Sequence, residues 1–380
     1  MRNIKQYVSV LLILSILLPL SGCWNYREVE SLAMVAGFAV DKSQIGYKYH
    51  ITYEFLDLSN DKMGSKLIES DGDSIFDCAR KAIGKIGKKL YFSDCKLIVL
   101  SKEIASEGIQ NLTDWLMRDT EPRISLNLAV SEEKTAADIL RLKATANPLV
   151  GLEMWQALEK NISTLGEAPD IKLYEVNNIL ATETDSLILP LLISSTDVKE
   201  KTAEFGGTAV FKDDRMIGKL NREETKYLLL IRSQLKGGLL LTSMENNNKD
   251  ITLEISECKS QLSHRMTDQE LSMNVNVNMK VFLAEDDTSK NYASIEGLDQ
   301  IEESANNTLD YGITTLVKKV QSEYDSDIFG FASSIHRTDP DLWKKLKPDW
   351  DNVFQNLKIT TTSKVSISDT ATRRTKSKEG

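Results

Sequence analysis

The sequence is poor in the residues that usually build catalytic and metal sites. Its 380 residues include only three histidines, His50, His264 and His336. They lie far apart, and none has a partner at the spacing of a metal-binding pair such as H-x-x-x-H. No P-loop, G-x-G-x-x-G loop or G-x-S-x-G nucleophile turn is present. We therefore expect no catalytic residue, no cofactor and no metal, and we favour a binding or assembly role over an enzyme.

An excess of positive charge is also lacking. The formal net charge is −9 at pH 7, which makes the chain a poor candidate for binding nucleic acid or an anionic membrane surface directly. Apolar residues make up 41% and charged residues 27%, as in globular proteins. With only 7 prolines and no low-complexity tract, disorder is expected only in a flexible tail at residues 371–380.

The N-terminus has the pattern of a secretory signal peptide. Arg2 and Lys5 supply positive charge, and residues 8–20 are almost entirely apolar but too few to span a bilayer comfortably. The stretch ends in Leu20-Ser21-Gly22-Cys23, the box of bacterial lipoprotein signals. We predict cleavage between Gly22 and Cys23 and lipidation of Cys23 as N-palmitoyl and S-diacylglycerol cysteine. The alternative is a signal anchor with an incidental cysteine.

Lipid on Cys23 leaves an odd number of other cysteines. Cys78, Cys95 and Cys258 are scattered along the chain, so no disulfide framework is implied. A bridge between Cys78 and Cys95 is one interpretation, and buried free thiols are the favoured one.

Hydrophobic periodicity predicts an N-terminal α/β domain over residues 23–200. Residues 32–40 indicate a strand buried on both faces, and residues 47–55 alternate between apolar and polar side chains as in a half-exposed strand. His50, Thr52 and Glu54 fall on the polar face, so His50 is expected to be solvated. The predicted order continues with helices at 73–90, 104–117 and 149–162, another after Ser131, and strands at 96–100 and 124–130.

Two further units are predicted. Residues 201–240 contain a hairpin at 204–220, with Asp213 and Asp214 at its tip, and a helix capped by Asn221. Residues 241–370 contain strands at 251–255, 271–283 and 357–367, a long amphipathic helix at 298–324 and a helix around Trp350. The fold class is therefore α/β (α+β) in three domains, with mixed and antiparallel sheets packed with helices, after the cleaved signal peptide.

Three local patterns allow both a functional and a structural interpretation. Asp325-x-Asp327 suggests a cation site, although a turn that ends the helix is favoured. Trp343 with Lys344, Lys345 and Lys347 suggests a docking patch, although a core tryptophan beside solvated lysines is favoured. The segment 24–27, with its Trp and Tyr, suits either a membrane interface or packing against the body of the protein.

Three separated segments resemble a known family over about residues 22–370. They are Gly22-Cys23-Trp24-Asn25-Tyr26-Arg27-Glu28-Val29 with Ala33–Gly37, Gly206–Lys212 with Ile217–Leu220, and Asp327–Phe331 followed by Trp343, Trp350 and Phe354. The chain is similar to the Ger(x)C spore germination lipoproteins, the C subunits of nutrient germinant receptors. The family often has Asp where Asn25 stands and Gly where Ala332 stands.

The resemblance implies a three-domain protein without known enzymatic activity on the outer face of the inner spore membrane. Its implied partners are two integral-membrane receptor subunits, one transporter-like and one with large soluble domains, besides the lipid bilayer itself. The leading hypothesis is an assembly or signalling subunit needed for nutrient-triggered germination. The alternatives are an extracytoplasmic solute-binding lipoprotein that feeds a transporter and a cell-envelope hydrolase.

Overall fold

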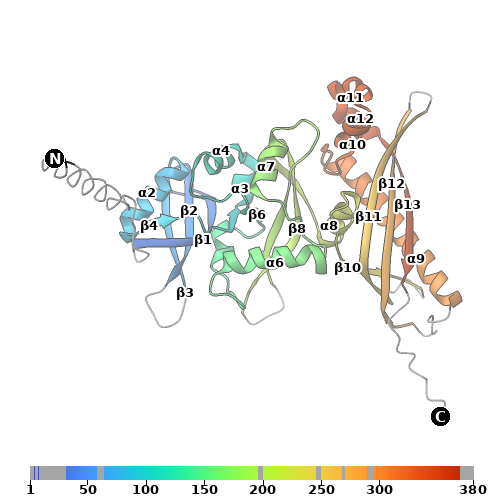
Figure 1. Cartoon of the computed structure of the whole chain (residues 1–380), viewed down its shortest axis with the longest axis horizontal. Helices are drawn as coiled ribbons and strands as arrows, with labels where there is room; N and C mark the ends of the chain where they lie inside the picture. The colour runs from blue at the N-terminus through green and yellow to red at the C-terminus, as the bar shows by residue number, and fades with distance from the viewer. Residues whose placement is uncertain are drawn as a thin grey trace, which may run out of the picture.

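The computed structural model describes residues 31–57, 64–195, 200–244, 250–267, 270–288 and 295–368, together with residues 4, 7 and 292. In this part of the chain, helices pack on two β-sheets that follow one another along the long axis of the molecule (Figure 1). The predicted fold class, α/β with mixed and antiparallel sheets, is confirmed. The signal peptide, Cys23, segment 24–27 and the tail at 371–380 lie outside the described residues.

The first sheet has a parallel centre with antiparallel strands at both edges. Its order is β3-β2-β1-β5-β6-β7-β8-β9, and β4 pairs with β1 beside this path. β1, β5, β6 and β7 run parallel, whereas the β2–β3 and β8–β9 hairpins pair antiparallel with their neighbours. The strands are β1 (Leu32–Lys42), β2 (Tyr49–Asp57), β3 (Gly64–Gly72), β4 (Lys89–Tyr91), β5 (Leu97–Leu100), β6 (Asn127–Ser131), β7 (Ile188–Ser194), β8 (Ala203–Lys212) and β9 (Arg215–Leu220).

Helices cover both faces of this sheet, which gives the first unit two apolar layers. Adjacent strand residues point to opposite faces, so Phe38 joins one apolar cluster and Ala39 the other. On the Phe38 side lie α2 (Ile75–Ile86), α3 (Lys102–Glu107), α4 (Gln110–Arg118) and α7 (Leu173–Leu180), and on the Ala39 side lie α5 (Ala136–Leu140) and α6 (Val150–Thr164).

The two-layer cover confirms one strand prediction and corrects another. Apolar residues of β1 are buried on both faces, as the sequence indicates. The expected polar face of β2 is not solvated, because α5 and α6 lie over it. Thr52 and Glu54 are fully buried there, and His50 is half-buried. Alternation of residue types identified the two faces of β2 but could not show that both are covered.

The predicted hairpin at 204–220 forms as β8 and β9, with the turn at Asp213 and Asp214. These strands continue the first sheet next to β7, although the sequence assigns them to a middle unit at 201–240. The helix α8 (Arg222–Ile231) follows, and Asn221 caps it in a capping box with Glu224, as predicted. α8 packs against β8 and also against β11 (Ile251–Thr267) and α9 (Ile295–Glu323) of the second sheet's unit, and so connects the two sheets.

Two 17-residue strands form the second sheet's centre. β11 is much longer than the strand predicted at 251–255, whereas β12 agrees closely with the one predicted at 271–283. The order of the sheet is β10-β11-β12-β13, with β12 and β13 parallel. A long helix, α9, lies on one face and packs its predicted stripe, Ile301 to Val320, into the core. Its Asn306 and Glu302 accept the backbone N–H groups of Val365 and Ile367 on the edge strand. The elements are β10 (Gly238–Thr242), β11 (Ile251–Thr267), β12 (Glu270–Asp286), β13 (Lys358–Ile367) and α9 (Ile295–Glu323).

Short helices pack at one end of the second sheet. Trp343 is 4% exposed and lies with its ring centroid 5.3 Å from that of Trp350, while Lys344 and Lys345 are exposed. The interpretation as a core tryptophan beside solvated lysines is confirmed. The helices are α10 (Phe331–Thr338), α11 (Pro340–Leu346) and α12 (Trp350–Asn356), with a 3-10 turn η3 (Lys347–Asp349) before the last.

Several elements differ from the prediction. The expected helix at 104–117 is divided into α3 and α4, because Gly108 adopts a φ of +121° and the Asp214 carboxylate accepts the N–H of Gln110. The structure also contains elements that were not predicted, since they are short or lack clear periodicity: β3, β4, β7, β10, α7, α10 and α11. Cys78, Cys95 and Cys258 are free thiols, so the bridge between Cys78 and Cys95 is not formed.

Candidate functional site

Cys23 is the one residue to which the sequence assigns a chemical role, and it lies outside the described part of the chain. The search for a site therefore rests on buried polar groups and on clefts. Among the described residues, no group of three or more His, Cys, Asp or Glu side chains is placed to hold a metal ion. Within the same part of the chain, no helix has the length and apolar character needed to cross a bilayer.

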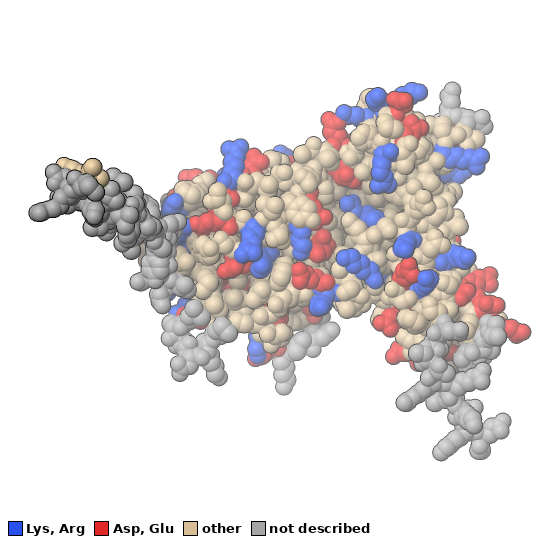
Figure 2. Space-filling model, viewed as in Figure 1, with Lys and Arg blue, Asp and Glu red and all other residues tan. Residues whose placement is uncertain are grey.

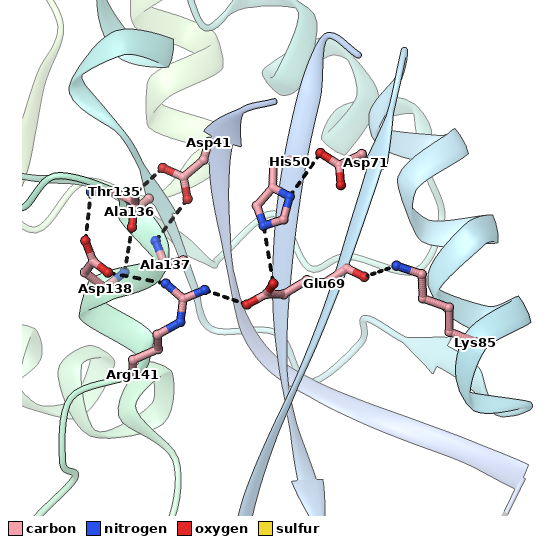
Figure 3. Close-up of polar contacts among 10 residues, drawn as sticks. All are labelled: Asp41, His50, Glu69, Asp71, Lys85, Thr135, Ala136, Ala137, Asp138 and Arg141. Atoms are coloured by element: carbon pink, nitrogen blue, oxygen red, sulfur yellow. Dashed lines mark hydrogen bonds and ion pairs between the residues drawn. The ribbon is translucent and has the colours of Figure 1, made fainter. Parts of the chain in front are cut away.

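Two buried carboxylates of the first sheet hold helices of the Ala39 face. Asp41, at the end of β1, accepts the N–H groups of Ala136 (2.7 Å) and Ala137 (3.0 Å) in the first turn of α5 (Figure 3). Glu54 of β2 accepts those of Val150 (2.7 Å) and Gly151 (2.8 Å) at the start of α6. The first N–H groups of a helix have no partner within the helix, so these carboxylates complete its hydrogen bonding.

Burial and hydrogen bonding act in opposite directions on these two acids. Burial raises the pKa of Asp41 and of Glu54, whereas the N–H groups that they accept favour the charged form. Gly151 lets Glu54 approach, because a Cβ there would lie 3.1 Å from the Glu54 carboxylate and 3.2 Å from the Gly37 Cα. Both acids therefore have a structural use that accounts for their burial.

A half-exposed network lies beside Asp41 and contains His50 (Figure 3). His50 Nδ1 lies 3.1 Å from Asp71 Oδ1, and its Nε2 lies 3.7 Å from Glu69 Oε2. Arg141 pairs with Glu69, and the Ser43 hydroxyl donates to Asp71. Partial burial opposes the charge on Asp71, but hydrogen bonds from Ser43 and His50 outweigh it and hold the pKa of Asp71 below its usual range.

The same network does not have the geometry of a nucleophilic triad. In a triad the serine donates to the histidine, and the carboxylate orients the opposite ring nitrogen. Here the Ser43 hydroxyl donates to Asp71, so His50 has no serine to activate. The prediction that His50 is solvated is wrong in detail, since its ring on β2 lies against Glu69 and Asp71 of β3.

The third buried carboxylate lies after α9 in the second unit. Asp327 is 6% exposed and accepts the N–H groups of Phe329, Gly330, Phe331 and Ala332 at the start of α10. Burial raises the pKa of Asp327 to about 6, although these N–H groups and the nearby Arg232 favour the ionised form. The turn predicted after the long helix is therefore confirmed, and Asp327 caps the next helix.

An acidic cleft of about 470 Å³ lies between the two units, next to Asp327. Lys212 of β8 reaches across it to Asp325 (2.9 Å) and Asp351 (2.8 Å). The indole N–H of Trp350 is buried at its wall without a partner. Seven carboxylates line the cleft: Glu183, Asp185, Asp213, Asp214, Asp325, Asp327 and Asp351.

Each of these features ties one structural element to another, and none of them is arranged as a set of acid, base and nucleophile. The protein is of the α/β class. It has two sheets, the first covered by helices on both faces, and α8 and the β8–β9 hairpin join the two units. The same fold occurs in a solved structure described as the GerBC protein, with a TM-score of 0.57 and 20% identity. The match covers 87% of this chain and 96% of that one.

Sequence comparison identifies the family. Residues 25–194 match the family described as "Spore germination protein N-terminal domain", and residues 206–371 match "Spore germination B3/ GerAC like, C-terminal". The chain belongs to the Ger(x)C family of spore germination proteins.

Relatives from Bacillus subtilis (strain 168) match along nearly their whole length. Spore germination protein YndF is 24% identical over 98% of each chain. Spore germination protein KC is 22% identical over 92% of each chain. Spore germination protein B3 is 24% identical over 89% of this chain and 91% of its own. The resemblance of the three sequence segments to this family is thereby confirmed.

Replacing Glu54 by Gln tests the cap on α6. A Gln side chain offers one acceptor oxygen and places an NH₂ group against the second N–H. We expect the free energy of unfolding to fall by about 2–3 kcal/mol, measured by chemical denaturation. The matched control is Glu69→Gln on the adjacent strand, whose side chain is 44% exposed, with an expected change below about 1 kcal/mol. Equal effects of the two variants would contradict the capping role.

The raised pKa of Asp327 predicts a pH-dependent stability. At pH 5 the folded chain still holds a proton on Asp327 that the unfolded chain has released, whereas by pH 7 both states have released it. The free energy of unfolding therefore falls as pH rises through 6. We expect the wild type to lose about 1 kcal/mol more than Asp327→Asn over this range.

Denaturant titrations at several pH values measure this difference, and Asp325→Asn, two residues away, should keep the wild-type dependence. The same slope in the wild type and in Asp327→Asn would show that Asp327 does not titrate in this range.

Proposed function

We propose that this chain is a lipid-anchored subunit of a spore germinant receptor complex, needed for nutrient-triggered germination. It acts by assembly or signalling with two integral-membrane subunits, one transporter-like and one with large soluble domains, and not by catalysis. The observation that supports this most strongly is the pair of family matches, which together run from residue 25 to residue 371. Relatives named as spore germination proteins match over almost the whole chain.

The use of the buried acids supports a non-catalytic mechanism. Asp41, Glu54 and Asp327 are engaged by helix N-termini, and His50 is held between two carboxylates with no nucleophile on its ring. The solute-binding alternative requires two similar lobes around a ligand. The two sheets differ in strand number and order, so that alternative gains no support.

Lipid on Cys23 would hold the first unit close to the membrane. Leu32, where β1 begins, lies nine residue steps after Cys23. A fully extended chain of that length reaches at most about 30 Å. On the face in view, basic and acidic side chains are interspersed over the first unit, so acyl chains and partner proteins, more than surface charge, would determine attachment (Figure 2). The proposed location is the outer face of the inner spore membrane.

Replacing the anchor residue tests the membrane attachment. We expect Cys23→Ala to lose incorporation of labelled palmitate and to move from the membrane to the soluble fraction of spores, because no thiol remains for diacylglyceryl transfer. Cys258→Ala, which removes a half-buried thiol of β11, should keep both the label and the location. Palmitate on the Cys23→Ala protein would contradict the assigned site.

Deletion of the gene tests the proposed role. Spores without this chain should lose germination in response to one set of nutrients, measured by loss of optical density, while growing cells keep their normal viability. Expression of the wild-type chain should restore the response. Normal germination with every nutrient, in a strain that also lacks related C subunits, would contradict the proposal.

A further inference from the structure

A second cleft, of about 450 Å³, is lined by residues of β11, α10 and the end of α8. These elements lie at the boundary between the two sheets (Figure 1). This cleft is distinct from the acidic cleft, and Asp185 is the one acid that lines both among the described residues. A bond from the Ser260 backbone N–H to the Ser233 hydroxyl (3.2 Å) joins β11 to the residue that follows α8. A molecule in this cleft would therefore contact both units of the protein.

Two hydroxyl groups at this cleft are buried without a hydrogen-bond partner. Ser334 of α10 is 3% exposed, and its hydroxyl makes no bond, although a helical serine can bond to the carbonyl four residues earlier. The hydroxyl of Ser260 on β11 is also buried and unpaired. Buried polar groups are normally paired, so two such groups at one cleft indicate a site that lacks its polar partner.

Two guanidinium groups line the same cleft. Arg232, half-buried after the end of α8, donates one Nη1 bond to the carbonyl of Ile328 (2.8 Å). Among the described residues the Ile328 carbonyl is the one hydrogen-bond acceptor of Arg232, so most of its five N–H donors remain available. Asp185, Asp327 and Glu175 interact with its charge at longer range. Arg337 is exposed on the last turn of α10. A guanidinium matches the two oxygens of a carboxylate in a planar, bidentate arrangement.

The balance of charge in the cleft points to a monoanion. The lining carries two arginines and Asp185, and Asp327 and Glu175 also act on the charge of Arg232, so the acids around the cleft disfavour a dianion such as hydrogen phosphate. We propose that this cleft binds a small organic carboxylate. Arg232 and Arg337 hold its carboxylate group, the unpaired hydroxyls of Ser260 and Ser334 complete the polar contacts, and its body fills the rest of the cleft. The site does not depend on the proposed role in germination.

Ligand-observed NMR on the full chain in detergent tests this site, with sodium lactate as the probe. Lactamide, which has nearly the same shape but no charge, is the matched control ligand, and inorganic phosphate tests the preference for a monoanion. We expect a saturation-transfer signal from lactate that levels off as the lactate concentration rises. Phosphate should compete with lactate only weakly, and lactamide should give no signal. Equal transfer to lactate and lactamide, or tighter binding of phosphate, would overturn the proposal.

Two variants assign the binding to this cleft. Arg337→Gln should weaken lactate affinity about tenfold, because it removes a charged donor, whereas Lys345→Gln, an exposed neighbour on α11, should leave the affinity unchanged. Ser334→Ala should keep the thermal stability of the free protein and still weaken lactate binding, which a purely structural hydroxyl would not do. Equal lactate affinity in the wild type, Arg337→Gln and Ser334→Ala would place the binding elsewhere.

Discussion

Buried carboxylates bound to the first N–H groups of helices hold this structure together. Asp41 and Glu54 extend from the first sheet to helices that begin about 95 residues later in the chain, and Asp327 closes the turn before α10. A helix start leaves several N–H donors unpaired, and a carboxylate inside the protein needs donors. Burying either the unpaired helix start or the carboxylate alone would cost free energy, so their pairing fixes where the helix meets the sheet.

The close packing of α6 on the first sheet depends on this pairing. Gly37 and Gly151 allow the two backbones to approach, since a Cβ on Gly37 would lie 3.4 Å from the Gly151 Cα and a Cβ on Gly151 would lie 3.2 Å from the Gly37 Cα. At that separation the Glu54 carboxylate reaches the start of the helix. Larger residues at these positions would displace the helix and leave a buried charge unpaired.

Besides the packing of α8 against both sheets, specific polar contacts join the two units. Tyr324, after α9, donates its hydroxyl to the carbonyl of Lys219, and Ser326 donates to the carbonyl of Phe211. Lys212 bridges to Asp325 and Asp351. Both clefts open at this junction, so a ligand or a partner that binds there would contact both sheets and could alter how they are held together.

Local patterns in the sequence were sufficient to predict elements with strong periodicity or clear caps. They include β1, the β8–β9 hairpin, the Asn221 cap of α8 and the apolar stripe of α9, and all four are confirmed. The lipoprotein box before Cys23 depends on local sequence in the same way and stays a prediction. β3 is as long as β2 but has few apolar residues, β7 is a continuous apolar run that contains Pro190, and β10 has only five residues, so none of the three shows a clear period.

Tertiary structure alone decided the burial of Glu54 and the unpaired state of Ser334. Glu54 alternates with apolar residues and so predicts a solvated position, but a helix that begins at residue 150 covers it. Ser334 is one of two adjacent serines in a helix, and only the position of α10 at a cleft beside β11 distinguishes it. The partner of Glu54 and the strand that faces Ser334 across the cleft both lie 70 to 100 positions away in the sequence, and short-range periodicity cannot reveal them.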